Sequence, residues 1–476
     1  MPPTTRPRYV LLRGGEATTR YETDHEPLFR QESNFAYLFG VKEPDCYACI
    51  CVDEARPVST LFVPEYSLEY AVVMGPPRTL ESYKTEYGVD QVYHRSSLDD
   101  YFPSGAVLLT VKGVNTDSGN ESVPAVLPRM ERFTVDASPA LYLALAEQRA
   151  VKNELELGLM AHVNRITCLA HAWVMRHSRP GMMEFQQESL FAHFGLYCGQ
   201  CRHTSYTSIC GSGAHASVLH YGHAAMPNAK MIADGELCLL DMGAELQFYG
   251  SDVTCTFPAN GVFTPDQRTV YQTVLDAQWA VMERLRPGVY YPDMHTLAYK
   301  VILLGLTKAG VLRGNVDDML ACNLGAVFMP HGLGHFLGID THDVAGRPPG
   351  CDDDVRKGNV DFTLPGYKKL RLRRVLVEGN VLTVEPGLYF IDMLLDKALA
   401  DPVQCTFIVP EALARFRGSG GVRIEDDVVI TKDGVRNLTR CPRTVSDIEA
   451  WMRGEIQNLN QLECPWSLAM SEHGAF

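Results

Sequence analysis

The chain has 476 residues, of which 46% are hydrophobic and 21% charged, which predicts a large core divided among about two or three domains. Its formal charge of −14 at pH 7 argues against nucleic acid as a partner. No stretch approaches the roughly 18 uninterrupted apolar residues of a membrane span, and neither end carries a signal core or a targeting tag, so we expect a cytoplasmic protein that does not enter a membrane.

The N-terminal part of the chain mixes apolar runs with helical stretches. The runs include CYACICVD, STLFVPE and AVLLTVKG, an alternation typical of a compact α/β domain. A long helical pattern follows from about Leu141 through Val174, where apolar residues recur every three or four positions. We therefore place a small α/β domain at residues 1–145, a larger domain at 146–450 and a C-terminal tail at 451–476.

The larger domain shows the same order of elements twice. Two helical patterns precede a pair of strands that each carry an aspartate, and two more precede strands that carry glutamates. The third helix is predicted to begin at a capping box of Thr264 and Gln267, with Pro265 in its first turn, and to be closed by Pro287–Gly288. This order predicts an α+β protein whose larger domain contains a duplicated helix–helix–sheet unit.

The two aspartates are Asp241 and Asp252, in the stretches ELCLLDMGAEL and QFYGSDVTCTF, which we expect to pair as an antiparallel hairpin. A two-residue turn at Leu246–Gln247 would set Asp241 directly opposite Asp252 on one side of the sheet. Cross-strand Cβ atoms are roughly 5 Å apart, which suits two carboxylates that hold metal ions about 3.5–4 Å from each other.

Three further residues lie in similar apolar contexts: His335 in FMPHGLGHFLGID, Glu385 in VLTVEPGLYF and Glu425 in GVRIEDDVVI. Alone, a strand aspartate is most often a surface residue and a buried histidine a core residue. Five together favour a shared site, because buried carboxylates would become neutral unless cations lie among them. Two divalent ions would balance four carboxylates, which predicts a two-metal hydrolase.

Eight stretches of the chain occur in the order seen in one enzyme family: YETDHEPLFRQESNFAYLFGV, LLTVKGVNTDSG, SYTSICGSG, HYGHAAMPN, SDVTCTFPANGVFT, FMPHGLGHFLGIDTHD, LTVEPGLYFID and GVRIEDDVVIT. In these stretches the chain resembles the pita-bread metallopeptidases, and among them the prolidases, which cleave Xaa-Pro dipeptides that end in proline or hydroxyproline. The resemblance covers nearly the whole chain. It implies a C-terminal pita-bread catalytic domain, and an N-terminal domain that serves substrate access and dimerisation.

The resemblance also implies how the five ligands are shared. Asp241, Asp252 and Glu425 would hold one ion, and Asp252, His335, Glu385 and Glu425 the other, so that Asp252 and Glu425 bridge. A water or hydroxide between the ions would attack the carbonyl carbon, and Glu385 would shuttle the proton. Mn²⁺ is the implied metal, although carboxylate-rich sites also accept Co²⁺ or Zn²⁺.

Further residues are implied around the scissile bond. His220 and His342 would donate hydrogen bonds to the substrate carbonyl or to the charge that develops on it, whereas His331 would orient its neighbours. The alternative for each is a packed or capping histidine. Tyr206, in SYTSICGSG, resembles a family pocket residue, although a tyrosine in an apolar strand is otherwise most often a core residue.

A dipeptidase must sense a free C-terminus, and a guanidinium matches a carboxylate bidentately. Arg371 aligns with the clamp that the resemblance implies, with Arg373 and Arg374 as nearby alternatives. Alone, the run KKLRLRR that contains them would most often be a solvated basic face. Arg423, two residues before Glu425, would anchor either the substrate carboxylate or the acids of the site.

Three functions remain open: a di-metal Xaa-Pro dipeptidase, an aminopeptidase P that takes longer peptides, and a catalytically dead pita-bread scaffold that only binds partners. The resemblance implies a homodimer in which one N-terminal domain covers the other subunit's site. The stretch at 346–369 is longer than the matching family segment and is predicted to be a mobile surface loop.

The chain contains 14 cysteines, and two pairs have the spacing of a zinc half-site: Cys46 with Cys49, and Cys198 with Cys201. The pairs are far apart in the chain, so we favour reduced core cysteines over a zinc ribbon. A redox role for Cys198 and Cys201 would need an exposed, electropositive surrounding.

Overall fold

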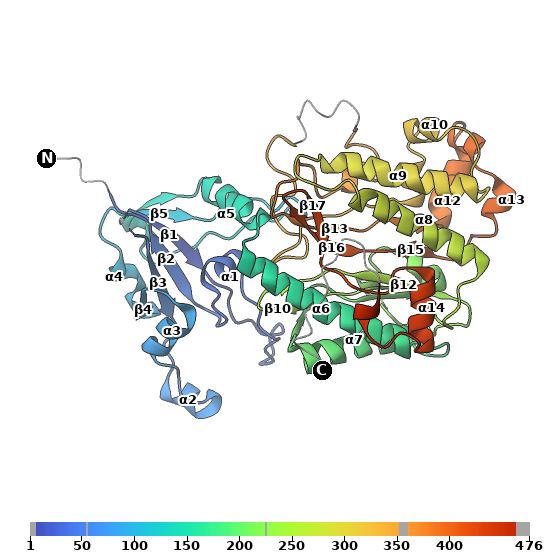
Figure 1. Cartoon of the computed structure of the whole chain (residues 1–476). Coiled ribbons are helices and arrows are strands. Elements are labelled where there is room, and N and C mark those ends of the chain that lie inside the picture. Colours follow the sequence, from blue (N-terminus) through green and yellow to red (C-terminus); the bar gives the residue numbers. More distant parts are fainter. Residues whose placement is uncertain (1–5, 54–55, 224–225, 352–359, 463–476) are drawn as a thin grey trace. The chain divides into compact units, whose positions relative to one another are not determined.

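The computed structural model describes residues 6–53, 56–223, 226–351 and 360–462 (Figure 1). The chain divides into two compact units, the first ending at Arg149 and the second beginning at Ala150. Among the described residues, none of the helices combines the length and the hydropathy needed to cross a membrane. Residues 352–359 of the predicted loop and 463–476 of the predicted tail lie outside the described residues.

The first unit is built on a mixed six-stranded sheet in the order β4-β3-β2-β1-β5-β6. Neighbouring residues of β1 face opposite sides of this sheet, so Leu11 and Leu12 belong to two different buried clusters. Its strands are β1 (Arg8–Arg13), β2 (Tyr47–Cys51), β3 (Val58–Val63), β4 (Gln91–His94), β5 (Val107–Thr110) and β6 (Thr134–Asp136). Its helices are α1 (Ser33–Phe39), α2 (Leu68–Met74), α3 (Leu80–Tyr87), α4 (Leu98–Tyr101) and α5 (Ala140–Ala150).

Three of the four paired cysteines, Cys46, Cys49 and Cys201, are buried core residues, and Cys198 is half-buried. Cys46 packs with Leu12, whereas Cys49 packs with Leu11 on the other face of the sheet, so the two thiols do not share a site. Burial raises the pKa of Cys46 to about 12 and that of Cys201 to about 11. Thiolate character is therefore low at both positions, which argues against a reactive pair at Cys198 and Cys201.

The long helix predicted from Leu141 through Val174 is in fact two helices. The first, α5, ends at Ala150, and α6 (Glu154–His177) begins after Asn153. The Asn153 side chain accepts hydrogen bonds from the backbone N–H groups of Leu155 and Glu156, and Glu156 completes a capping box. An asparagine N-cap satisfies helix donors that would otherwise lack a partner, so it starts a new helix inside a continuous apolar pattern.

The second unit has the predicted order of helix, helix and sheet in both halves. The first half contains α6, α7 (Glu184–Gly199), β7 (His203–Thr204), β8 (Ile209–Ser212), β9 (Leu237–Asp241), β10 (Ala244–Leu246), β11 (Tyr249–Gly250) and β12 (Thr254–Pro258). The second half contains α8 (Pro265–Met282), α9 (Tyr291–Lys308), α10 (Val316–Ala321), α11 (Gly325–Phe328), β13 (Val381–Val384), β14 (Gly387–Tyr389), α12 (Asp392–Ala400), α13 (Pro410–Leu413), β15 (Gly421–Arg423), β16 (Asp426–Thr431), β17 (Gly434–Asn437) and α14 (Val445–Arg453). The predicted α+β class and the repeated helix–helix–sheet order are thereby confirmed.

Each half forms its own small sheets, in the orders β12-β9-β8 and β11-β10-β7 in the first and β13-β16-β17 and β14-β15 in the second. The helices α8 and α9 lie side by side (Figure 1). The two halves meet at an isolated backbone bridge that joins Thr254 to Glu425. This bridge therefore contains a predicted metal ligand.

The start of α8 is predicted correctly, whereas its end is not. The capping box of Thr264 and Gln267 starts α8 as predicted, but α8 ends at Met282, before the predicted Pro287–Gly288 stop. The described part of the predicted tail, 451–462, packs onto this unit. Trp451 is buried and donates its indole N–H to the Ala172 carbonyl at 2.8 Å.

The predicted hairpin turn is wrong by one residue, which shifts the cross-strand pairing by two residues. Leu246 pairs with Tyr249, so the loop residues are Gln247 and Phe248, which both have positive φ angles of 50° and 73°. The strands β9 and β12 keep this register and place Asp241 opposite Thr254. Asp252 therefore does not face Asp241; it precedes β12, and its backbone N–H donates to Asp427 Oδ2 at 2.9 Å.

Candidate active site

Four of the predicted ligands converge in the second unit. One ligand atom from each of Asp252, His335 and Glu425 lies within 4.8 Å of the other two, and all three residues are buried. His335 Nε2 is 3.3 Å from Asp252 Oδ2 and 3.7 Å from Glu385 Oε1. The first half of the unit supplies Asp252 and the second half supplies the other three, so the site forms where the halves meet.

His335 has the orientation of a metal ligand. Its Nδ1 lies 2.9 Å from the Phe336 carbonyl oxygen, which can only accept, so we assign the ring proton to Nδ1. The lone pair of Nε2 then faces the carboxylates of Asp252 and Glu385. Such an arrangement is unfavourable unless a cation lies between them, so the residues present fit a divalent metal.

The pKa values of the site groups also indicate that the site needs a cation. Burial and mutual repulsion raise the pKa of Asp252, raise that of Glu385 to about 7 and raise that of Glu425 well above its ordinary value. Burial alone would lower the pKa of His335, yet the carboxylates of Asp252 and Glu385 raise it. A site of this kind favours positive charge, and its oxygen and imidazole donors suit Mn²⁺, Co²⁺ or Zn²⁺.

The metal-free protein is expected to lose stability through Glu385 as the pH rises. The pKa of this carboxyl is 4.5 ordinarily and about 7 in the fold, so its contribution is complete below 4.5 and is lost as the pH rises through about 7. Urea unfolding in a chelator at about pH 5 and about pH 8 measures the effect. The difference in unfolding free energy between wild type and Glu385→Gln at each pH isolates the contribution of this carboxyl. If wild type does not lose stability relative to Glu385→Gln over this range, the raised pKa of Glu385 is contradicted.

Asp241 lies at the end of β9, where two side chains hold its carboxylate. Tyr206 donates its hydroxyl to Oδ1 at 2.5 Å, and Arg423 donates Nη2–H to Oδ2 at 2.5 Å. The charge of Asp241 also raises the pKa of Asp252. Arg423 thus contacts one of the predicted acids, and the Tyr206 hydroxyl contacts the same acid.

His331 uses both ring nitrogens within the protein. Its Nδ1 lies 2.7 Å from the Gly332 carbonyl oxygen, and its Nε2 lies 3.0 Å from the Tyr389 hydroxyl. Burial, assisted by Arg423, lowers the pKa of His331 to about 3, so the ring is neutral. Its Nδ1 is 3.6 Å from Glu385 Oε2, which agrees with a role in orienting neighbouring groups.

His220 and His342 lie close enough to Arg371 to respond to its charge. Burial, then His335 and Arg371, lower the pKa of His342 to about 2. Partial burial, then Arg423 and Arg371, lower the pKa of His220. The His342 ring meets the His335 ring edge-on, with centroids 4.5 Å apart. Both imidazoles are therefore neutral, and that of His342 packs against a predicted ligand.

The structure separates the three arginines of the basic run. Arg373 donates to the backbone carbonyls of Leu370 and Lys368, both at 3.0 Å, and Arg374 donates to the Ala345 carbonyl at 3.0 Å. These two guanidinium groups hold the backbone of nearby segments. Arg371 is the member whose charge reaches the histidines of the site.

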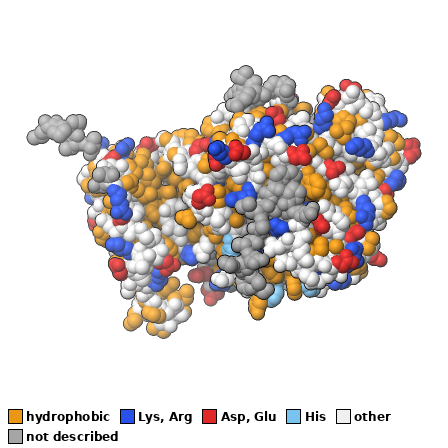
Figure 2. Space-filling model, in the orientation of Figure 1, with side chains coloured by type: hydrophobic (Ala, Val, Ile, Leu, Met, Phe, Trp, Pro, Cys, Tyr) orange, Lys and Arg blue, Asp and Glu red, His pale blue; other side chains and the backbone are white. Residues whose placement is uncertain are grey.

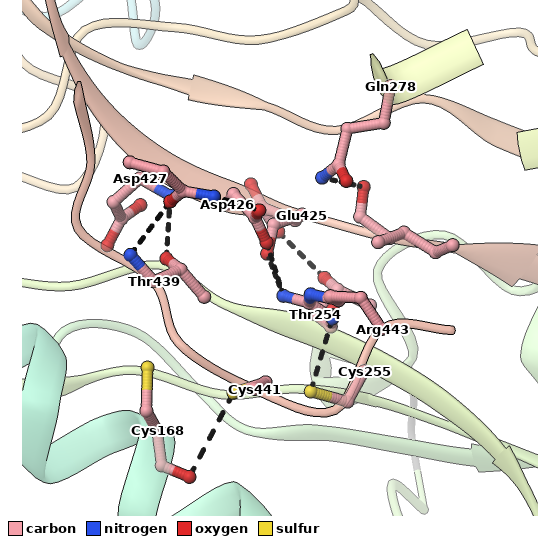
Figure 3. A network of polar contacts seen from close by, with 12 residues as sticks. Cys168, Thr254, Cys255, Gln278, Glu425, Asp426, Asp427, Thr439, Cys441 and Arg443 are labelled. Carbon is pink, nitrogen blue, oxygen red and sulfur yellow. Dashed lines mark hydrogen bonds and ion pairs between the residues drawn. The ribbon is translucent and has the colours of Figure 1, made fainter. Parts of the chain in front are cut away.

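Sequence reasoning missed a group of residues behind the ligands (Figure 3). Thr254 donates its hydroxyl to Glu425 Oε2 at 2.7 Å, and Asp427 accepts the backbone N–H of Asp252. The run of three acids at Glu425–Asp427 was a usable signal, because Asp427 lies two residues beyond Glu425 in an apolar strand. Thr254 and Arg443 gave no comparable signal.

Two family models match the chain. The model for metallopeptidase family M24 matches residues 158–432, and the model for the aminopeptidase P N-terminal domain matches residues 4–107. The matched ranges fall in the second and first units respectively.

Individual proteins also match over nearly the whole chain. The chain is 50% identical over 447 residues to an Xaa-Pro dipeptidase of Rattus norvegicus, covering 94% of this chain and 89% of that protein. It is 35% identical to a probable Xaa-Pro aminopeptidase of Sordaria macrospora, covering 92% of this chain and 90% of that protein. Among solved structures, zinc-substituted Escherichia coli aminopeptidase P in complex with product superposes with a TM-score of 0.76 at 29% identity, covering 96% of each chain.

Proposed function

The chain belongs to metallopeptidase family M24, and on that premise we propose that it is a metal-dependent hydrolase of Xaa-Pro dipeptides. The observation that carries this function is the buried cluster of Asp252, His335 and Glu425. Similarity to the Xaa-Pro dipeptidase of Rattus norvegicus over 94% of the chain supports the substrate class.

Asp241, Asp252, His335, Glu385 and Glu425 would hold two divalent cations, and we propose Mn²⁺. When bound, the cations would lower the pKa of a water molecule between them and polarise the substrate carbonyl. Asp241 adds a second carboxylate from the first half, held in place by Tyr206 and Arg423. The donor set of four carboxylates and one imidazole accords with Mn²⁺, as well as with Co²⁺ or Zn²⁺.

The protein's own groups would position the peptide and move the proton. Neutral His220 and His342 can each donate an N–H to the carbonyl oxygen of the substrate. The carboxylate of Glu385 can accept a proton at Oε2 and pass it to the departing proline nitrogen. Arg371 would bind the terminal carboxylate bidentately.

Proline is a reasonable target for such a site. An Xaa-Pro amide has no N–H, so a peptidase that recognises this group by hydrogen bonding cannot hold it. A site that contacts the carbonyl oxygen and the terminal carboxylate does not need the missing donor. The neutral histidines and Arg371 supply those two contacts.

The alternative is an aminopeptidase P activity on longer peptides, which is favoured by the Sordaria macrospora relative and by the aminopeptidase P structures. If Arg371 binds the proline carboxylate, kcat/KM for Gly-Pro should exceed that for Gly-Pro-Ala by at least about tenfold. Rates on both peptides with the same metal-loaded protein measure this. Equal rates would favour the aminopeptidase, and no hydrolysis of either would favour the non-catalytic scaffold.

We also propose a homodimer in which the first unit contributes to substrate access. Apolar side chains gather over α2 in Figure 2, where Leu68, Val72 and Val73 are 82%, 79% and 81% exposed. An exposed apolar patch of this kind is typical of a surface that contacts another protein. Light scattering tests the dimer, and a monomer at working concentration would exclude it.

We further propose a cytoplasmic location, which the free cysteines in the described part of the chain support because they suit a reducing compartment.

A further inference from the structure

Arg443 lies behind the site, in the segment between β17 and α14, and its side chain is buried. Its Nη1 donates to the Thr254 carbonyl at 2.8 Å (Figure 3). Its Nη2 donates to the Glu425 carbonyl at 2.6 Å and to Asp426 Oδ1 at 2.5 Å. One guanidinium therefore contacts both halves of the second unit at the point where they meet.

The two carbonyls that Arg443 contacts belong to Thr254 and Glu425, which are also hydrogen-bonded to each other. The backbone N–H of Glu425 donates to the Thr254 carbonyl at 3.2 Å, and the Thr254 hydroxyl donates to Glu425 Oε2 at 2.7 Å. Arg443 adds a bond to the carbonyl on the other side of Glu425. The backbone of this ligand is thus fixed through both its N–H and its C=O group, and its carboxylate through Thr254.

We propose that Arg443 is a positioning residue that sets the Glu425 carboxylate for metal binding, an inference that rests on the proposed function. The geometry of the guanidinium carries this role, because Asp426 forms an ion pair with it and balances its charge locally. The planar fork serves Thr254 and Glu425 at once, which a lysine ammonium cannot do with the same geometry.

The position of Arg443 is itself fixed. Its own carbonyl accepts the hydroxyl of Tyr271, which lies on α8 and is fully buried. The next residue, Thr444, is the N-cap of α14. The guanidinium therefore projects from a segment held by two helices, as a positioning group requires.

A matched control lies three residues earlier. Arg440 is also buried, and its Nε and Nη2 donate to the carbonyls of Leu459 and Leu462 at 3.0 and 2.8 Å. Its bonds hold the chain that follows α14 and do not reach Thr254 or Glu425. Loss of Arg440 should therefore reduce stability without changing the metal site.

The test compares Arg443→Met/Asp426→Asn, which removes the charged pair without stranding Asp426, with Arg440→Met. Each metal-free protein is titrated with Mn²⁺ by calorimetry, and thermal unfolding of the same samples is recorded. We expect Mn²⁺ affinity to fall about 10- to 100-fold in the double variant, with a loss of kcat larger than any rise in KM. Arg440→Met should keep its affinity within about twofold of wild type.

Unchanged Mn²⁺ affinity in the double variant would overturn the proposal, whatever the thermal midpoint. If that variant does not fold, Arg443→Lys carries the same test, since it keeps the charge but loses the fork. Wild-type affinity in Arg443→Lys would then overturn the proposal, and an intermediate loss would support it. Wild-type protein that binds Mn²⁺ but leaves Gly-Pro uncut would refute the proposed function without affecting this result.

Discussion

Replacing Asp252 with asparagine is expected to reduce kcat/KM for Gly-Pro by on the order of 10³-fold or more, about 4 kcal/mol of transition-state stabilisation. Asp252 Oδ2 is 3.3 Å from His335 Nε2, within the cluster that combines both halves of the second unit. Asparagine keeps the shape of the side chain but removes its negative charge, so the site should also lose bound metal. Gly-Pro hydrolysis and the metal content of the same samples measure both effects.

A suitable control is Asp276→Asn, because Asp276 is an exposed residue of α8 whose carboxylate accepts a hydrogen bond from Gln272. This variant should keep its metal and its rate. The backbone bond from Asp252 to Asp427 does not involve the replaced group, so the Asp252→Asn protein should remain folded. An Asp252→Asn protein with full activity and full metal content would show that the proposed ligand set is wrong.

Replacing Arg371 with methionine is expected to lower kcat/KM for Gly-Pro by about 10²-fold, which corresponds to about 2–3 kcal/mol for the loss of one partner of a hydrogen-bonded charge pair. Most of the change should be in KM, because the substrate carboxylate is bound before and during the reaction. The substrate Gly-Pro amide lacks this carboxylate. The variant should therefore cleave the amide at nearly the wild-type rate.

The matched variant is Arg374→Met, since Arg374 belongs to the same basic run but donates to the Ala345 carbonyl. Steady-state kinetics on both substrates for the three proteins separate a carboxylate clamp from a general effect of charge. If Arg371→Met loses as much activity on the amide as on the dipeptide, Arg371 does not bind the terminal carboxylate.

The fold of the second unit was largely predictable because its signals are local. The alternation of helical and strand patterns gave the repeated order, and the Thr264 capping box marked the start of α8. The acids in apolar strands pointed to a shared site, since a buried carboxylate without a cation is costly. Asp252, His335 and Glu425 do converge.

The errors arose where one local pattern permitted two structures. The apolar recurrence over residues 141–174 gave no stop at Ala150, whereas the structure ends α5 there and starts α6 at the Asn153 N-cap. The hairpin turn consists of Gln247 and Phe248, which both have positive φ angles. Tight hairpin turns with positive φ angles prefer glycine or asparagine, so these two residue types did not mark the turn. Because of the resulting shift, Asp252 does not face Asp241 across the sheet.

The polar network behind the ligands could not be predicted from sequence. Arg443 contacts Glu425, 18 residues earlier in the chain, and Thr254, 189 residues earlier. Nothing in the sequence specifies which buried carbonyls a guanidinium will reach, because that depends on how the two halves pack. The same limit applied to Tyr389, whose hydroxyl meets both His331 and Arg423.

The central claim, that the buried acids hold two divalent cations that the reaction requires, is tested most directly by counting metal in the active protein. Elemental analysis of protein that hydrolyses Gly-Pro should find two divalent ions per chain. Chelation should abolish hydrolysis, and added Mn²⁺ should restore it. Full activity in protein that contains less than one ion per chain, or after complete chelation, would contradict the account.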